Sequence, residues 1–363
     1  MRRQPHQPPV GGAAPAARGA ALRVHAAASL AVLILCGCGA SAGLADRSAT
    51  TGASGAAPRA ATATTTPSRA EAPCGAASTA TVAQTVGEVA RRIYLTEVSS
   101  AEVSADRRQV EGDSGLLSAL AAGDRAGVAE AVRRLVYSGT HIVRLRVSTG
   151  ATVLADVGGP YILAPVGGSL RVGGRVVGRY VLSVQDDLGY VKLETRFIGL
   201  PMTMRAGGRR IPVEGVIAPP SPLPQHGLVS YAGKRYQTVS VAASAFPAGP
   251  LTITVLVPVA QASSASCAVV RATELGRIAH TVWNRVSAIG ASPSALPSLA
   301  GGLTGGLLYV RAGGRQLAGS TSPGPGRIPA SGRLVYRGRS YLVTSFAARA
   351  GGQAVRVYQL TPA

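Results

Sequence analysis

The sequence predicts an α+β protein in which five-stranded antiparallel sheets follow one another in tandem, with long amphipathic helices packed on them. The first observation is a hairpin pattern at Gly332–Phe346, where two alternating runs flank a tight turn at Arg337-Gly338. The second is repetition, because the turn sequence RAGGR occurs at 205–209 and again at 311–315. The third is a set of segments whose apolar residues recur with the period of a helix.

The last repeat contains five short predicted strands. A hairpin over 307–320 precedes the Gly332–Phe346 hairpin, and residues 354–360 supply a closing strand. The repeat before it has the same parts in the same order, in the segments 202–215, 226–241 and 251–258. Repeats of this length indicate tandem domains, because solenoid units are shorter.

A third and more divergent copy precedes these two. Its predicted hairpins cover 143–156 and 168–184, and its predicted closing strand is YVKLETRF at 190–197. The sequence therefore predicts three sheet units.

Helical periodicity marks the segments between and before the sheets. Residues 81–98 and 266–289 each repeat an apolar residue every three or four positions, which gives one apolar face. A further helix is predicted from Asp124, an N-cap residue, to Tyr137. The predicted order is helices, two sheet units, a helix and a last sheet unit.

This layout resembles the extracellular PAS-like sensor domains of the Cache family. The resemblance is clearest where LLYVRAGGRQLAGS (307–320) is followed by GRLVYRGRSYLVTSF (332–346). The helix 124–137 leading into residues 141–156 resembles the start of single-Cache sensors of histidine kinases, and GRVVGRYVLSV (174–184) resembles their central strand. The resemblance implies tandem PAS/Cache-like sheets and the binding or sensing of a small molecule.

The N-terminal segment predicts export. Residues 1–25 are basic, and an apolar run of about ten residues at 26–35 is too short to span a bilayer. The following Leu35-Cys36-Gly37-Cys38 resembles a bacterial lipobox, which implies that Cys38 carries the lipid. Cys36 departs from the usual lipobox residue, and an ordinary secretion signal remains the alternative. The expected location is the outside of the cytoplasmic membrane, with a lipid anchor or in secreted form.

The cysteines left after such processing are Cys74 and Cys267, each just before a predicted helix. An exported compartment permits disulfides. We therefore predict a Cys74–Cys267 bridge, with two buried thiols as the alternative.

Composition and boundaries complete the organisation. The 363 residues hold 37 basic and 16 acidic side chains, a formal charge of +21. We do not expect nucleic-acid binding, because no basic tract is interleaved with aromatic residues. The predicted segments are a signal with lipobox (1–38), a disordered Ala/Ser/Thr/Pro linker (39–73), helices with the first sheet (74–200), the second sheet (201–258), a linker and helix (259–302) and the third sheet (303–363).

Catalytic and metal motifs are not found in the sequence. Neither a nucleophile elbow, a phosphate loop, a dinucleotide fingerprint nor a His/Cys metal spacing occurs. We therefore expect a protein that is not an enzyme and needs no cofactor or metal.

The candidate ligand-binding residues gather in the first unit. Alternation would place arginines of its strands on one face, where guanidinium groups could bind a small carboxylate or amino acid. The apolar loop 157–168 could act as a lid, and the turn at 185–189 could hold an ammonium group. The candidates are Arg144, Arg146, Tyr161, Arg179, Ser183, Asp186 and Lys192. A solvated sheet face explains the same charges and remains open.

Two function classes follow from these patterns. The first is an extracytoplasmic, lipid-anchored sensor or ligand-binding protein that acts through a sensor or transporter in the membrane. The second is a scaffolding lipoprotein of the cell envelope without a ligand. The basic last unit, which has no acidic residue after Glu274, favours anionic lipid headgroups or an acidic protein as an additional contact. A general bias towards arginine on a solvated face explains the same charges and remains the alternative.

Overall fold

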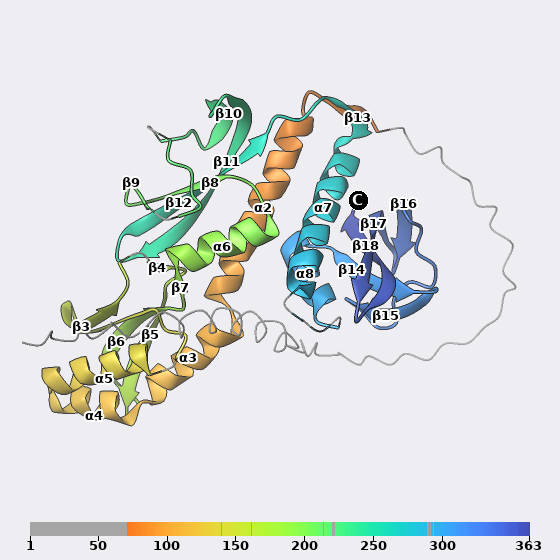
Figure 1. Cartoon of the computed structure of the whole chain (residues 1–363). Coiled ribbons are helices and arrows are strands. Elements are labelled where there is room, and N and C mark those ends of the chain that lie inside the picture. Colours follow the sequence, from red (N-terminus) through yellow and green to blue (C-terminus); the bar gives the residue numbers. More distant parts are fainter. Residues whose placement is uncertain are drawn as a thin grey trace, which may run out of the picture.

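The structure, a computed structural model, describes residues 71–363 apart from 139, 161, 213, 220–221, 289, 291 and 293. The predicted signal with Cys38, the linker up to residue 70 and Tyr161 therefore lie outside the described residues. The described part is α+β, as predicted: antiparallel sheets carry long helices on their faces (Figure 1).

The helices and strands have the following bounds. The helices are α2 (Ser78–Val98), α3 (Ala101–Gly112), α4 (Ser114–Ala122), α5 (Arg125–Tyr137), α6 (Asp187–Phe197), α7 (Cys267–Ser287) and α8 (Leu296–Thr304). The strands up to residue 210 are β1 (Pro73–Gly75), β2 (Arg144–Thr149), β3 (Thr152–Gly158), β4 (Ile162–Leu163), β5 (Val166–Val172), β6 (Arg175–Ser183), β7 (Gln185–Asp186), β8 (Met202–Ala206) and β9 (Arg209–Arg210). The later strands are β10 (His226–Tyr231), β11 (Lys234–Phe246), β12 (Gly249–Pro258), β13 (Ser263–Ser266), β14 (Leu307–Ala312), β15 (Arg315–Gly319), β16 (Gly332–Tyr336), β17 (Arg339–Ala350) and β18 (Gln353–Pro362).

The third sheet confirms the predicted five strands. Its order is β15-β14-β18-β17-β16, so the first strand of the unit lies beside the last. Helices α7 and α8 cover one face, where Val310, Val357 and Phe346 pack against the main core. The opposite face carries a small cluster that includes Tyr309 and Tyr341.

The second sheet repeats this order as β9-β8-β12-β11-β10, with α2 on its face. It differs at one end. The long strand β11 pairs with β10 near its start and with β4 at Ala245 and Phe246, and β4 pairs in turn with β7. Two short strands from the first unit thereby extend the second sheet.

Matching turns support the repeat. Gly207-Gly208 in the β8–β9 turn and Gly313-Gly314 in the β14–β15 turn all have positive φ, between 53° and 84°. Ala232-Gly233 and Arg337-Gly338 do the same in the next hairpin of each unit. Both central residues of a type I′ turn need positive φ, so each pair of hairpins turns in the same way.

The contact between helix and sheet is also repeated. A Cβ added at Gly87 of α2 would lie 2.5 Å from Cγ2 of Val239, the sixth residue of β11. A Cβ added at Gly276 of α7 would lie 2.5 Å from Oγ1 of Thr344, the sixth residue of β17. Each long helix therefore approaches its sheet at an equivalent point through a glycine.

The first sheet corrects the prediction of a fifth strand. It has four strands in the order β3-β2-β6-β5, because residues 190–197 lie in helix α6. Tyr190, Leu193 and Phe197 follow the helical spacing and are buried, and the Asp186 side chain accepts a hydrogen bond from Gly189 N as the N-cap. Lys192 consequently lies on a helix and is exposed.

Helix α6 has a counterpart in α8. Each ends at a glycine with positive φ, Gly199 (71°) and Gly305 (70°), and leads directly into the first strand of a five-stranded order. The repeated unit is thus a long helix, a short helix and a sheet. Helices α3–α5 and the first sheet are inserted between α2 and α6 in the first of these units.

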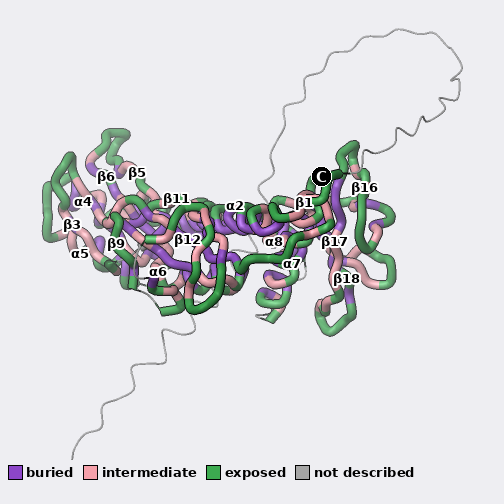
Figure 2. Tube along the Cα trace, turned by 90° about the horizontal axis from the view of Figure 1, so that it is seen from above, coloured by how far each residue is buried: buried purple, intermediate pink, exposed green. Residues whose placement is uncertain are grey.

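Two hydrophobic cores organise the described residues. The main core is continuous from the second to the third sheet through α2, α6, α7 and α8, and a separate core lies between α3–α5 and the first sheet. Figure 2 shows an elongated molecule with the first sheet at one end, the third at the other and buried residues along α2 between them.

The predicted disulfide is present. Cys74 and Cys267 are bonded, with their Cα atoms 4.6 Å apart. Strand β1 pairs with β13 at the same place, so the starts of α2 and α7 are joined both covalently and by backbone hydrogen bonds. Within the described part of the chain, none of the helices has the length and apolarity needed to span a membrane.

Candidate functional site

The first sheet brings two of the predicted ligand-binding arginines together. Nε and Nη2 of Arg144 donate to the two carboxylate oxygens of Asp156 at 2.7 and 2.8 Å, and Nη1 donates to the Gly159 carbonyl at 2.6 Å. Nε and Nη2 of Arg146 donate to the same Asp156 at 2.9 and 2.6 Å. Both guanidinium groups also lie over the Phe246 ring, at 5.3 and 4.4 Å from its centroid.

This cluster connects the first sheet to the end of β11. Burial raises the pKa of Asp156, but hydrogen bonds and charge from Arg144 and Arg146 outweigh it, so the pKa lies below its usual value. The carboxylate therefore stays ionised and holds both arginines. A ligand carboxylate at this place would have to displace Asp156.

The other candidates of the first unit lie apart from this cluster. Arg179 is exposed and pairs in register with Ser148, on the same face of the sheet as Arg146. The Ser183 hydroxyl is fully buried and is used by backbone, since it donates to the Leu163 carbonyl and accepts from Gln185 N. Asp186 caps α6 and Lys192 is exposed on that helix. The structure thus groups Arg144 and Arg146 and gives Ser183 and Asp186 structural contacts.

The predicted lid is a buried bridge. Ile162 and Leu163 form β4 between β7 and β11, and Leu163 and Ala164 are almost fully buried. The apolar character of the loop reflects this packing. Tyr161, the ligand contact predicted in it, lies outside the described residues.

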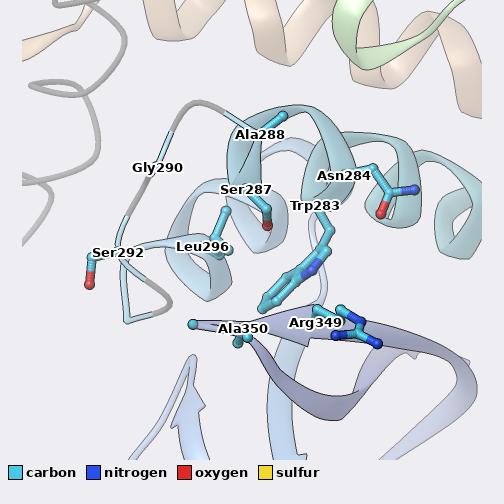
Figure 3. A pocket seen from close by; sticks show the side chains of 11 residues that line it. Trp283, Asn284, Ser287, Ala288, Gly290, Ser292, Leu296, Arg349 and Ala350 are labelled. Carbon is cyan, nitrogen blue, oxygen red and sulfur yellow. The ribbon is translucent and has the colours of Figure 1, made fainter.

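A cavity of about 530 Å³ opens at the other end of the molecule. It lies between the C-terminal end of α7, the start of α8 and the β17–β18 hairpin (Figure 3). Its volume is in the range of small-molecule sites. The lining residues are Trp283, Asn284, Ser287, Ala288, Gly290, Ser292, Leu296, Arg349, Ala350, Gly351 and Gly352.

The lining combines an apolar surface with a few polar groups. Trp283 and Leu296 are each 1% exposed and form the apolar part of the cavity wall. The Ser287 hydroxyl is buried and has no hydrogen-bond partner in the described structure. Because an unpaired buried hydroxyl costs free energy, a ligand that pairs with it would gain that amount on binding.

This cavity was not predicted from the sequence. The ligand was expected in the first unit, because the polar residues of the last unit are dispersed along the chain. One signal was available, since Trp283 is the single tryptophan of the protein. Its position on the apolar face of a predicted helix is also that of an ordinary core residue.

A second buried polar group lies where α2 faces α6. The Tyr190 hydroxyl donates to Oε1 of Glu194 at 2.7 Å, and Oε2 of Glu194 has no partner in the described structure. Burial raises the pKa of Glu194 to about 7. Burial and then the charge of Glu102 raise the pKa of Glu97, on the last turn of α2, to about 7. These carboxyl groups therefore gain or lose protons near neutral pH.

The described residues contain no group of three or more His, Cys, Asp or Glu side chains that could hold a metal ion.

Comparison with known proteins gives weak similarity only. No protein-family model matches the chain, and no curated protein does. The solved periplasmic domain of Vibrio cholerae LuxQ is similar over 77% of this chain and 100% of its own length, at 9% identity and a TM-score of 0.17. A second structure of that domain covers 79% and 97% at 8% identity and 0.14. The ligand-binding domain of Mlp24 with asparagine covers 77% and 95% at 10% identity and 0.16. TM-scores this low do not demonstrate a common fold and say nothing of function.

Proposed function

We propose that this protein binds a small molecule outside the cytoplasmic membrane, in the cavity between α7, α8 and the β17–β18 hairpin. The proposal rests on a cavity of about 530 Å³ that is lined by the buried Trp283 and by Ser287, whose buried hydroxyl has no hydrogen-bond partner in the described structure. A concave apolar site with a few polar groups is the usual form of a ligand pocket.

The chemistry of the lining favours a small carboxylate, including an amino acid. Its residues include one arginine, Arg349, and no acidic side chain, so the cavity favours a neutral or anionic ligand. The amide of Asn284 and the hydroxyl of Ser287 can pair with the ligand's polar groups, and the Trp283 ring offers an apolar contact.

The location and partners belong to the same proposal. The N-terminal signal supports export with a lipid on Cys38, and the Cys74–Cys267 bridge supports an oxidising compartment. The linker would then carry the folded part away from the membrane. A sensor or transporter in the membrane is the expected partner that responds to ligand binding.

The test uses the fluorescence of Trp283, which reports on the cavity directly because it is the only tryptophan. Small carboxylates and amino acids are titrated into the full chain, and a ligand is expected to change the emission and to raise Tm. Ser287→Ala should weaken binding about fivefold to tenfold with little change in stability, because the hydroxyl has no hydrogen-bond partner among the described residues.

The matched control is Arg285→Ala, an exposed residue of the same helix that does not line the cavity. It should leave the affinity unchanged. A broad library without any effect on emission or Tm would exclude the proposal, as would equal losses in Ser287→Ala and Arg285→Ala.

A further inference from the structure

The outer face of the third sheet, which is turned away from α7 and α8, carries two arginines side by side. Arg311 of β14 and Arg356 of β18 are directly opposite each other in register. Their neighbours Val310 and Val357 point into the main core, so alternation directs both arginines to the outer face. Like charges directly opposite on adjacent strands destabilise a sheet unless an anion compensates them.

The chain provides no such anion in this unit. Residues 303–363 contain eight arginines and no lysine, aspartate or glutamate. Among the described residues, one of these arginines forms an ion pair: Arg333 binds Glu71. Arg333 lies on the edge strand β16, which β17 separates from β18. The Arg311–Arg356 pair is therefore uncompensated.

The two guanidinium groups are held in place but keep unused donors. Nη2 of Arg311 donates to the carbonyls of Pro325 and Gly326 at 3.0 and 2.7 Å, while its Nε is buried without a partner in the described structure. Nη1 of Arg356 donates to the Ser345 hydroxyl at 3.2 Å. These partners are neutral, so both positive charges stay uncompensated. Within the described structure, Nη1 of Arg311 and Nε and Nη2 of Arg356 are the donors left for an external acceptor.

The second sheet supplies an internal comparison. Arg205 occupies the place of Arg311 in the repeated RAGGR turn, and its partner in register on β12 is Thr252. The strand order and the register of this pair are the same in both sheets. The scaffold therefore does not require an arginine at position 356, and its presence in the third sheet calls for a reason other than folding.

We propose that the Arg311–Arg356 pair is a binding site for a phosphoryl group. A tetrahedral dianion has enough oxygen atoms to accept from two guanidinium groups at once, and its two negative charges balance both arginines. The phosphoryl group can come from a soluble phosphorylated molecule or from an anionic lipid headgroup.

The experiment uses the full chain with Cys38→Ser, so that a lipid anchor cannot mediate membrane contact. Binding of inorganic phosphate is measured by calorimetry and by ³¹P line broadening, and binding to vesicles is measured by co-sedimentation with phosphatidylglycerol or phosphatidylcholine. Arg356→Thr introduces the residue that the second sheet has at the equivalent position, Thr252, and should weaken phosphate binding tenfold or more. Arg339→Thr, which removes the same charge from an exposed residue at the start of β17, should change it less than twofold.

Two results support the site and separate its sources. Phosphate binding together with Arg356-dependent binding to phosphatidylglycerol vesicles identifies a lipid headgroup, and phosphate binding without vesicle binding identifies a soluble phosphorylated molecule. The proposal is overturned if neither phosphate nor vesicles bind, or if Arg339→Thr loses as much as Arg356→Thr. Arg349 is left unchanged because it lines the cavity proposed for the small molecule.

Discussion

The second and third sheets have the same strand order but differ in what lies at the end of their long strands. In the second, the long strand β11 is extended by β4 and β7 and so holds the inserted first unit. In the third, the equivalent edge of the sheet is not extended, and the cavity lies where the end of α7 meets α8 and the β17–β18 hairpin. The comparison indicates that the repeated scaffold connects to the inserted unit in one copy and forms a cavity, the proposed ligand site, in the other.

The short helices show the same divergence at the level of single residues. Alignment of the terminal glycines Gly199 and Gly305 places Ala300 of α8 opposite Glu194 of α6, and Leu296 opposite Tyr190. The buried Tyr190–Glu194 hydrogen bond in the first copy is thus replaced by apolar packing in the second. The copy without the buried carboxyl group is also the copy that forms the cavity.

The largest expected effect comes from removing the disulfide that joins the two repeated units. The first copy consists of α2, α6 and the second sheet, and the second copy consists of α7, α8 and the third sheet. The double substitution Cys74→Ser and Cys267→Ser should lower the free energy of unfolding by about 3–5 kcal/mol, because the bridge closes a loop of 193 residues. Urea unfolding is followed by far-UV circular dichroism, which reports on both copies, and by Trp283 fluorescence, which reports on the third sheet and its helices.

Reduction provides the control for this substitution. The unmodified protein in dithiothreitol should unfold at the same urea midpoint as the variant without the bridge. An unchanged midpoint in the variant would mean that the β1–β13 pairing and the common core hold the two copies together without the disulfide.

A smaller effect, dependent on pH, should belong to the first copy alone. The carboxyl group of Glu194 has a folded pKa of about 7 and an ordinary value of 4.5, so between these values the folded state binds more protons than the unfolded state. The free energy of unfolding should therefore fall as pH rises from about 4.5 to about 7, by up to about 3 kcal/mol for this group. Glu194→Gln should remove that loss, so the variant is more stable than the wild type at pH 8 and equally stable at pH 4.

The matched control for this titration is Glu130→Gln on α5, an exposed carboxylate paired with Arg133. It should change the stability by less than about 0.5 kcal/mol at either pH. A wild-type stability that rises between pH 5 and 8, or a Glu194→Gln variant with the same pH dependence as the wild type, would contradict the role given to this buried group.

The sequence predicted the third sheet completely and the first sheet incompletely, for a physical reason. In the third sheet, tight turns with glycine fix both hairpins, and the alternating runs between them allow one period only. Residues 190–197 are compatible with either a strand or a helix. Tyr190, Val191 and Phe197 are residue types that are common in strands, whereas Tyr190, Leu193 and Phe197 have the spacing of one helix face. The N-cap at Asp186 and burial against α7 decide in favour of the helix.

The repeated long helices also carry a matching sequence signal. VGEVA at 86–90 and LGRIA at 275–279 each contain a glycine that follows an apolar residue and precedes a charged one, and both glycines contact equivalent strand positions. The cavity had no comparable signal, because it forms only where the end of α7, the start of α8 and a hairpin about sixty residues later meet. The charge pattern of the first unit was noticed, but the pairing of Arg144 and Arg146 with one aspartate depends on a strand register that composition does not reveal.

The smallest effects test whether the two copies pack in the same way. Gly87→Ala and Gly276→Ala each place a methyl group 2.5 Å from a β-branched side chain, Val239 and Thr344 respectively. Overpacking of this kind costs about 1–3 kcal/mol, and the better helix propensity of alanine returns up to about 1 kcal/mol. Each variant should thus lose about 1–2 kcal/mol in urea unfolding, and the two losses should agree.

A control and a rescue distinguish this contact from a general effect of glycine in helices. Gly302→Ala in α8 has open space around the new methyl group and should be neutral or stabilising. Val239→Ala should offset Gly87→Ala, so that the double variant is more stable than the sum of the single losses predicts. Additive losses, or a loss at one glycine only, would show that α2 and α7 approach their sheets differently, and the equivalence of the two copies would then be limited to the strands.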